Sequence, residues 1–316
     1  MNRLYFGDNL KWLSDQKEFP DASVDLIYLD PPFNSNADYN VLFREPSGQV
    51  SQAQFHAFTD TWSWADASDT YHQFIDTCPN VAVVELMEAL HSFLKHSPMM
   101  AYLAMMAPRL VELHRVLKPT GSLYLHCDPT ASAYLRTILD NLFGAENLRN
   151  EIVWQRTPSK GLMSRRLARN HDLILSYQKS DAATWKEDAI FQPYDLDALD
   201  EKTKAKYSHR DADGRLYQLD NLINPNPNRP NLTYQFLGVT KVWRWTKERM
   251  QKAYEEGLVI QPKAGAVPRF KRYLDEQRGK PLGDVWTDIA PINSQAQERL
   301  GFPTQMLKIK KRPAEF

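Results

Sequence analysis

Short apolar runs separated by longer amphipathic segments organise the first half of the chain. Residues 24–29 and 122–126 are brief, mainly apolar runs, a pattern typical of buried strands. Between them, residues 99–117 place leucine and methionine near helical spacing, and the sequence Lys-Pro-Thr-Gly at 118–121 stops this helix. The same patterns predict further strands at residues 3–6, 151–154 and 173–177, and helices after Gly7 and at 129–143. Strands that alternate with helices predict an α/β fold with a doubly wound, mostly parallel sheet.

The pattern changes near residue 180. Residues 202–229 are polar, rich in Asn and Pro, and have no helical period. A helix is predicted at 247–256, and Gly257 follows it at the position where glycine commonly ends a helix. We therefore divide the chain into a core over 1–180, a second region over 181–290 and a terminal segment over 291–316.

The composition restricts the function less than the pattern does. The 316 residues include 39 Lys and Arg and 39 Asp and Glu, so a nucleic-acid binder of this composition needs local basic patches. Cys78 and Cys127 are far apart, which indicates neither a disulfide framework nor a zinc cluster, and we predict no metal site. The N-terminus lacks an apolar signal region and no apolar run is long enough to span a bilayer. These features predict a soluble, cytoplasmic protein with no membrane partner.

The tetrapeptide Asp30-Pro31-Pro32-Phe33 follows the apolar run at 24–29 directly. Proline restricts the residue before it and cannot donate a backbone hydrogen bond, so this sequence predicts a stiff, extended corner. Open α/β sheets bind ligands at the edge where such a corner would lie. The alternative is that these four residues form only a turn.

This corner suits chemistry on an exocyclic amino group. The Asp30 side chain and a backbone carbonyl near Pro31 could accept two N–H bonds from a planar amine. The Phe33 ring could stack on a base that has left the duplex. The sequence therefore predicts a site for a flipped nucleotide base.

The corner and its surroundings resemble the amino-directed DNA methyltransferases of the DNA methylase N-4/N-6 family. The opening residues 5–10 (YFGDNL) and the stretches at 115–122 and 171–179 match the subgroup whose catalytic motif comes first. The resemblance implies a circularly permuted Rossmann-like core and the transfer of a methyl group from S-adenosylmethionine to a base nitrogen in double-stranded DNA. Aspartate at position 30 implies adenine N6, whereas serine would imply cytosine N4, which remains an alternative because it uses the same corner. The catalytic residues implied are Asp30, Pro31, Pro32 and Phe33, and the rings that stack on the base are Phe33 and Tyr39.

The resemblance also places a target-recognition region at 181–290. Basic and aromatic residues interleave there, and a second basic group follows the core strand at 151–154. A solvated basic face is the alternative for any single Lys or Arg. The DNA contacts predicted are Lys160, Arg165, Arg166, Arg169, Lys241, Arg244, Arg269, Lys271 and Arg272.

Two acidic residues outside the corner have alternative roles. The resemblance implies that Asp8 faces the adenine of S-adenosylmethionine, with Thr304 as a second cofactor neighbour. The alternative for Asp8 is a helix N-cap on Asn9 and Leu10. The segment His126-Cys127-Asp128-Pro129 is expected either to line the active-site edge or to form a tight turn in which Asp128 caps the next helix.

The usual glycine-rich cofactor turn is missing from this sequence. The family has such a turn after the segment that Arg299 to Gln305 resembles, yet no two of the 12 glycines here are spaced as Gly-x-Gly. We therefore expect residues 291–316 to begin an incomplete cofactor-binding segment with a basic tail. Three alternatives remain open: a truncated adenine methyltransferase, a catalytically silent DNA-binding remnant, and one half of a split enzyme completed by a second chain. A restriction subunit and a homodimer are further partners that the resemblance implies.

Overall fold

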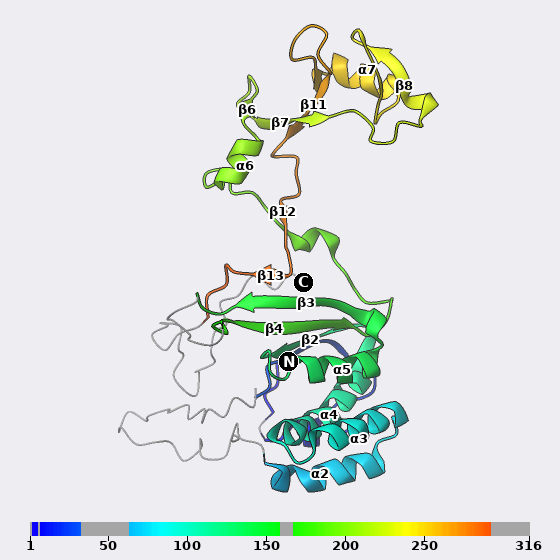
Figure 1. The fold of residues 1–316 in the computed structure, drawn as a ribbon, viewed down its shortest axis with the longest axis vertical. Helices are drawn as coiled ribbons and strands as arrows, with labels where there is room; N and C mark the ends of the chain where they lie inside the picture. Colours follow the sequence, from blue (N-terminus) through cyan, green and yellow to red (C-terminus); the bar gives the residue numbers. More distant parts are fainter. Residues whose placement is uncertain (1, 6, 33–62, 159–166, 292–316) are drawn as a thin grey trace, which may run out of the picture. The chain divides into compact units, whose positions relative to one another are not determined.

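The computed structural model describes residues 2–5, 7–32, 63–158 and 167–291 (Figure 1). Contacts within the chain divide it into two units. Unit 1 comprises the described residues up to 185 and those from 283 onward, and unit 2 comprises residues 186–282. Each unit is described by itself.

The centre of unit 1 is a five-stranded sheet with the strand order β1-β2-β4-β3-β13 among the described residues. Strand β1 is parallel to β2, and β3 is parallel to β13, whereas β4 runs antiparallel to both β2 and β3. Four of these five strands therefore point the same way, which confirms the prediction of an α/β fold with a mostly parallel sheet. The strands are β1 (Val24–Leu29), β2 (Leu117–Cys127), β3 (Leu148–Gln155), β4 (His171–Gln178) and β13 (Val285–Trp286).

Helices of unit 1 begin at polar capping residues. Ser63, Asn80 and Ser97 each accept a hydrogen bond from a backbone N–H in the first turn of the helix that follows. Pro98 then occupies the first turn of α4, where its missing N–H removes no helical hydrogen bond. The helices are α1 (Asn9–Leu13), α2 (Trp64–Thr77), α3 (Val81–Leu94), α4 (Pro98–Val116) and α5 (Ser132–Phe143), followed by the short η2 (Ala145–Asn147).

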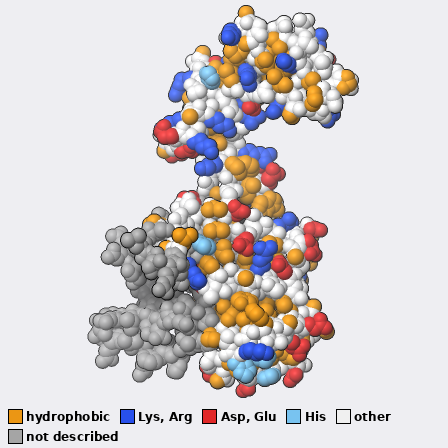
Figure 2. All heavy atoms as spheres, viewed as in Figure 1, with side chains coloured by type: hydrophobic (Ala, Val, Ile, Leu, Met, Phe, Trp, Pro, Cys, Tyr) orange, Lys and Arg blue, Asp and Glu red, His pale blue; other side chains and the backbone are white. Residues whose placement is uncertain are grey.

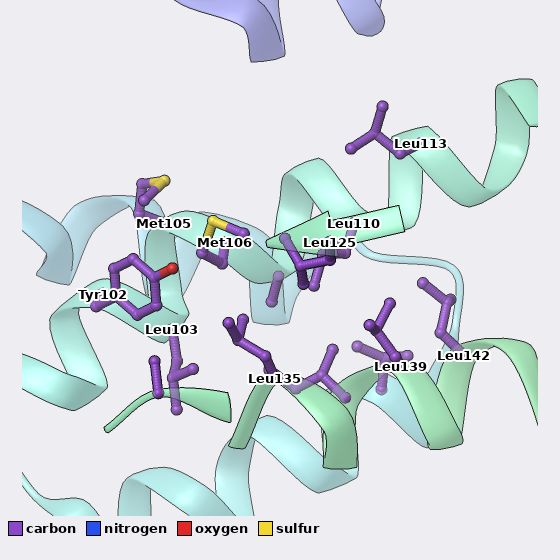
Figure 3. Packing of buried hydrophobic residues seen from close by; sticks show 14 of the residues in the cluster. Tyr102, Leu103, Met105, Met106, Leu110, Leu113, Leu125, Leu135, Leu139 and Leu142 are labelled. Carbon is purple, nitrogen blue, oxygen red and sulfur yellow. The ribbon is translucent and has the colours of Figure 1, made fainter. Parts of the chain in front are cut away.

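Helix α4 is the centre of the hydrophobic core. It is buried on nearly every side, from Met100 through Pro108, because α1 and α2 contact it as well as α3 and α5. Figure 3 shows Leu135 and Leu139 of α5 beside α4 side chains and Leu125 of β2. A helix that is apolar all round must be covered on all sides, and this packing holds the sheet and the helices together.

The polar sequence 118–121 ends α4, as predicted, but it also forms part of β2. Val24 pairs with Leu117 and Leu26 pairs with Ser122, so the intervening residues bulge out of the ladder. A side chain at Gly121 would meet the Asp25 carbonyl oxygen at 2.8 Å, so this close approach requires glycine.

Two other predictions about unit 1 need correction. Residues 3–5 form no strand, although residues 3–6 were expected to form one. Helix α5 begins at Ser132 and not at Pro129, because residues 128–131 form a turn. In that turn Asp128 accepts hydrogen bonds from the backbone N–H groups of Thr130 and Ala131.

Unit 2 contains small antiparallel sheets. One has the order β10-β11-β7-β6, and the others are the pairs β8-β9 and β5-β12. Its main core gathers around Trp243, which is fully buried, with Leu222, Phe236, Met250 and Val259. The elements are η3 (Glu187–Ile190), β5 (Phe191–Gln192), α6 (Glu201–Lys206), β6 (His209–Arg210), β7 (Leu216–Asn221), η4 (Pro230–Leu232), β8 (Thr233–Phe236), β9 (Val239–Val242), α7 (Lys247–Glu255), β10 (Val259–Ile260), β11 (Arg269–Tyr273) and β12 (Lys280–Pro281).

Of the two α-helices described in unit 2, α7 was predicted from the sequence and α6 was not. Helix α7 ends next to Gly257, whose positive φ of 71° matches its predicted role. Helix α6 was not expected, because residues 202–229 show no helical period. It forms because the Asp200 side chain accepts a hydrogen bond from the Thr203 N–H and starts a short helix. No helix in the described part of the chain is long and apolar enough to cross a membrane.

Candidate active site at the carboxyl ends of β1 and β2

Asp30 and His126 meet because two parallel strands end at the same edge of the sheet. Leu29, the last residue of β1, pairs with Leu125 of β2, so Asp30 and His126 come one position later on the two strands. His126 Nδ1 lies 2.9 Å from Asp30 Oδ1. Pro31 and Pro32 follow Asp30 and are half-buried. The predicted corner therefore lies beside a histidine at the carboxyl edge of the parallel strand pair.

The other ring nitrogen of His126 faces a second carboxylate. His126 Nε2 lies 3.3 Å from Asp172 Oδ2 on β4. The same Asp172 oxygen lies 2.9 Å from Arg156 Nε, just beyond β3. These four side chains form a line in which acid and base alternate, and we call Asp30, His126, Asp172 and Arg156 the charge chain.

The sheet brings the inner members of the charge chain together. His126 pairs with Ile174 across the β2–β4 ladder, and Asp172 lies two residues before Ile174 on β4. Asp172 in turn pairs with Trp154 on β3, and the Trp154 ring lies 5.7 Å from the His126 ring. Trp154 Nε1 donates a hydrogen bond to the Ile289 carbonyl at 2.8 Å, which fixes this ring against the segment that follows β13.

Burial is greatest in the middle of the charge chain. The Asp172 side chain is 1% exposed and that of His126 is 10% exposed, whereas Asp30 at one end is 62% exposed and Arg156 at the other is 41% exposed. Burial disfavours the charged form of His126, but the hydrogen bonds to Asp172 and Asp30 outweigh it and raise the pKa of His126 to about 9. The cluster is therefore anchored inside the protein at Asp172 and presents a carboxylate to solvent at Asp30.

Neighbouring titratable groups on the strands are held uncharged. Burial, with help from Asp128, Glu151 and Asp172, raises the pKa of the Cys127 thiol to about 12. Burial and the Asp30 charge also raise the pKa of Tyr28. Neither group therefore contributes charge at this edge near neutral pH.

The predicted site residues fall into two groups. Phe33, Tyr39, Lys160, Arg165, Arg166 and Thr304 lie outside the described residues. Asp30, Pro31 and Pro32 lie at the edge described above. Arg169 is exposed, and its Nη1 lies 3.3 Å from Thr130 Oγ1. Thr130 follows the strand β2 that carries His126.

Asp8 lies at the start of α1 and acts as its N-cap. Its carboxylate accepts a hydrogen bond from the Leu10 N–H at 2.9 Å, and Arg109 Nη2 lies 2.6 Å from the same oxygen. Arg109 Nε also donates to the Asn9 side chain at 2.8 Å. The capping role that the sequence offered as an alternative is therefore present, and contact with a cofactor stays a prediction.

A small hollow lies beside α1. Its lining includes Tyr5, Trp12 and Phe19, whose rings are close together, and its volume is about 160 Å³. Leu13 and Leu113 complete its apolar side. The hollow can receive a flat apolar group of limited size.

The predicted DNA contacts in unit 2 differ in exposure and in whether an acidic side chain pairs with them. Lys241 and Arg244 are exposed, and Arg244 donates to the Ile223 carbonyl. Arg269 lies half-buried on β11. Lys271 is only 13% exposed and pairs with Asp211, and Arg272 pairs with Asp220 at 2.6 Å. Acidic partners therefore already neutralise two of the five cations predicted here.

Trp243, one of the aromatic residues interleaved with the basic residues of unit 2, belongs to the core. Trp243 is 0% exposed, and its Nε1 donates to the Tyr234 carbonyl at 2.8 Å. The alternation of side chains along an extended segment places Trp243 inward and its neighbour Arg244 outward.

Asp172 and Arg156 were not predicted as site residues. Asp172 does stand within the apolar run of β4, and a carboxylate in a buried strand requires a charged or hydrogen-bonding partner. That signal was available in the sequence. It indicated that a partner exists but did not show which residue it is.

Comparison with known proteins identifies the family. A sequence profile described as DNA methylase, of the N6/N4 type, matches residues 24–308. Because this match spans most of the chain, the chain belongs to the N6/N4 DNA methylase family. The family assignment agrees with the α/β sheet and with the acidic corner at its edge.

Individual relatives are more distant. The chain is 22% identical to the Type II methyltransferase M.KpnI of Klebsiella pneumoniae, over 94% of this chain and 64% of that protein. It is 24% identical to the Mod subunit of the Type III restriction-modification enzyme StyLTI of Salmonella typhimurium, over 92% of this chain and 41% of that protein. The chain thus spans less than two thirds of the length of these curated relatives.

Two solved structures are similar in part. One is the crystal structure of the M1.HpyAVI–SAM complex, at 16% identity over 62% of this chain and 60% of that chain, with a TM-score of 0.28. The other is the cytosine-N4-specific PvuII DNA methyltransferase, at 14% identity over 57% of this chain and 50% of that chain, with a TM-score of 0.27. Family membership accordingly rests on the sequence match.

Proposed function

We propose that this chain is an amino-directed DNA methyltransferase that methylates N6 of adenine. The observation that carries this proposal is the place of Asp30-Pro31-Pro32 at the end of β1, beside His126, in a chain of the N6/N4 DNA methylase family. The 62% exposure of the Asp30 side chain lets a substrate reach it. An exposed carboxylate held at a sheet edge can accept a hydrogen bond from a base amino group.

Two acceptors at this corner would bind the target amine. Asp30 has two carboxylate oxygens, and one of them already faces His126 Nδ1. The second oxygen and the backbone carbonyl of Pro31 would accept the two N–H bonds of the amino group. Adenine within a duplex cannot reach this corner, so the base must leave the stack at a cost of roughly a few kcal/mol. Placement of the amine and electrostatic alignment would then accelerate the reaction.

The methyl group would come from S-adenosylmethionine, which supplies it from a sulfonium centre. The residues near α1 fit the adenosine part of this cofactor, because Asp8 offers a carboxylate and Tyr5, Trp12 and Phe19 border the hollow beside it. The described residues offer no Gly-x-Gly turn for the methionine part, since the sequence contains none. We propose Asp8 as a cofactor contact, and Thr304, outside the described residues, as a second.

Duplex DNA would bind through exposed cations of unit 2 and of the segment near Arg169. Figure 2 shows Lys and Arg side chains spread over unit 2 with hydrophobic side chains between them. Lys241, Arg244 and Arg269 form no ion pair with the described residues, and each could neutralise a phosphate. A restriction subunit, a homodimer and a second chain that completes the cofactor site are further proposed partners.

Adenine is preferred over cytosine because the corner begins with aspartate, the form that resembles adenine-specific members of the family. Cytosine N4 remains the alternative product. Digestion of methylated DNA to nucleosides distinguishes the two. N6-methyl-2′-deoxyadenosine is the expected product, and N4-methyl-2′-deoxycytidine alone would replace the adenine proposal while leaving the methyltransferase proposal in place.

The first test is a calorimetric titration of S-adenosylmethionine into the purified 316-residue chain, with and without duplex DNA. Binding near the micromolar range is expected and would be followed by a methyl-transfer assay. Absence of cofactor binding in both states, together with salt-sensitive DNA binding, would indicate that the chain only holds DNA or requires a second chain. Transfer restored by a co-expressed partner would separate those two outcomes.

A further inference from the structure

His126 can satisfy both of its carboxylate neighbours only when both ring nitrogens carry a proton. Its Nδ1 lies 2.9 Å from Asp30 Oδ1, and its Nε2 lies 3.3 Å from Asp172 Oδ2. A neutral imidazole has one donor and one acceptor nitrogen, so it would place a lone pair against one carboxylate. An imidazolium donates to both.

Charge balance along the charge chain gives the same result. With His126 protonated, two acids and two bases alternate, and Asp172 has a cation on each side. With His126 neutral, the cluster would carry a net negative charge in a place where Asp172 is 1% exposed. Buried unpaired charge is costly, so the protonated form is favoured.

The two carboxylates of the charge chain have different freedom to move. Asp172 lies on β4 between β2 and β3 and contacts His126 and Arg156, whereas Asp30 follows β1, the outermost strand on its side of the sheet among the described residues, and is 62% exposed. An exposed aspartate by itself samples several rotamers. A charged donor anchored in the sheet can select one of them.

We propose that His126 is a positioning residue whose imidazolium holds one oxygen of Asp30 and directs the other toward the substrate amine, with the buried Asp172, itself paired with Arg156, fixing the imidazolium from inside the sheet. The kinetic consequence of this inference rests on the proposed methyltransferase function. The geometric consequence, a histidine that stays protonated because of Asp30 and Asp172, does not.

Other groups near His126 do not take over this role. From β2, Cys127 follows it and Asp128 caps the next turn. From β1 the facing groups are Asp30 and Tyr28, and from β4 they are Asp172 and the adjacent His171, with Arg156 beyond β3. Burial holds the Cys127 and Tyr28 pKa values above their usual ranges, so these two groups stay neutral where His126 titrates.

The first experiment measures the protonation of His126 directly. Nuclear magnetic resonance of the full chain with ¹³C- and ¹⁵N-labelled histidine would follow all eight histidines from pH 5 to pH 10, with the His126 signals assigned by their loss in His126→Asn. His126 is expected to remain doubly protonated until about pH 9 in the wild-type chain. Asp30→Asn and Asp172→Asn should each lower this midpoint. Because Asp30 is exposed, Asp30→Asn should fold even if Asp172→Asn does not.

The matched control is His72→Asn, since His72 is exposed on α2 and belongs to no proposed site. It should leave the titration of His126 unchanged. A His126 midpoint near 6.5 in the wild-type chain, or one that Asp30→Asn does not move, would overturn the inference whether or not the chain transfers methyl groups.

The second experiment compares substitutions that keep different donors. The side-chain nitrogen of asparagine occupies the place of histidine Nδ1, which faces Asp30, whereas that of glutamine occupies the place of Nε2, which faces Asp172. His126→Gln should therefore slow single-turnover methyl transfer by about tenfold to a hundredfold, and His126→Asn by less. The dissociation constants for DNA and for S-adenosylmethionine should stay within about twofold, as expected for a residue that acts through Asp30.

The pH profile separates positioning from a merely structural role. The wild-type transfer rate should fall above about pH 9, where the imidazolium is lost, and His126→Asn should not show this fall. Equal rates and equal profiles for wild type and both variants would overturn the inference while leaving the proposed function intact. A wild-type chain that binds DNA but transfers no methyl group would contradict the proposed function alone, and the resonance measurement would still decide the role of His126.

Discussion

Acid–base pairs occur in both units, but they are built in opposite ways. In unit 1, Asp172 is 1% exposed and its two cationic neighbours come from other strands. In unit 2, Arg215 bonds to Asp275 and Glu276 while all three side chains are at least one third exposed. Buried charges depend strongly on geometry, whereas exposed pairs contribute little and are screened by salt. The buried ion pairs of unit 1 therefore fix the positions of its carboxylates, whereas the exposed pairs of unit 2 contribute mainly local charge.

The unit 2 pairs also limit how much positive charge its surface offers. Lys271 has Asp211 as a partner and Arg272 has Asp220. Lys241, Arg244 and Arg269 belong to the same unit and form no such pair with the described residues. DNA affinity should therefore depend unevenly on these five residues.

The largest expected effect is that of Asp30→Ala on methyl transfer. Loss of the carboxylate removes both the acceptor for the target amine and the partner of His126 Nδ1. The single-turnover rate should fall by roughly a thousandfold or more, the size associated with loss of a main transition-state contact. DNA affinity, measured by fluorescence anisotropy, should change by less than about threefold, because Asp30 is not a phosphate contact. A variant that transfers methyl groups at the wild-type rate would contradict the mechanism.

The second largest expected effect is on the free energy of unfolding, which should fall more when a buried carboxylate is lost than when an exposed one is lost. Asp172→Asn leaves His126 and Arg156 without their shared buried anion, and removing one member of a buried pair costs about 3–5 kcal/mol. Asp275→Asn removes an exposed partner of Arg215 and should cost less than about 1 kcal/mol. Urea denaturation, with amide hydrogen exchange to resolve the two units, measures both. Equal costs would contradict the contrast drawn between the units.

The stability of unit 1 should depend on the protonation of His126. Its folded-state pKa of about 9 lies above the ordinary value of 6.5, so protonated His126 stabilises the folded chain fully below pH 6.5. That contribution is lost as the pH rises through 9 and amounts to roughly 3 kcal/mol. Lys179 acts in the opposite sense, because burial lowers its pKa to about 8 and its neutral form is favoured in the fold.

The difference between wild type and His126→Asn therefore isolates the histidine. Free energies of unfolding measured from pH 6 to pH 10 should converge as the pH rises, because Lys179 is the same in both chains. A constant difference across this range would mean that folding does not raise the pKa of His126.

The smallest effects are expected for single cations of unit 2. Lys241→Ala, Arg244→Ala and Arg269→Ala should each weaken DNA binding several-fold and reduce the slope of log affinity against log salt by about 1. Lys271→Ala should change the slope less, since Asp211 already holds this ammonium. Lys252→Ala on α7 is a matched control, because Lys252 is 77% exposed, lies near Glu256 and is outside the predicted set. A larger loss for Lys271 than for Arg244 would reverse the assignment of contacts.

Several elements could be predicted from the sequence because their signals lie within a few residues. The strand Val24–Leu29 has the predicted bounds, and α4 begins and ends within one residue of the predicted helix. The glycine after α7 has the positive φ that its position requires. Hydrophobic spacing, capping residues and proline act on neighbouring residues, so they can be identified without knowledge of the fold.

The sequence also determined where the acidic corner lies, directly after a strand. It did not determine what stands beside that corner. Asp30 and His126 are 96 residues apart in the chain, and His126 and Asp172 are 46 apart. The order of strands in the sheet brings them together, and strand order depends on which apolar faces bury one another across the whole unit.

The same reason explains why the local pattern did not show which side chains are available. Trp243 stands beside Arg244 but lies in the core, and Lys271, a predicted DNA contact, lies against Asp211. Local patterns determine which segments become strands and helices and which residue types stand at their ends. Only the tertiary structure decides which side chains are buried and paired, because burial and ion pairing are contacts between segments that are distant in the sequence.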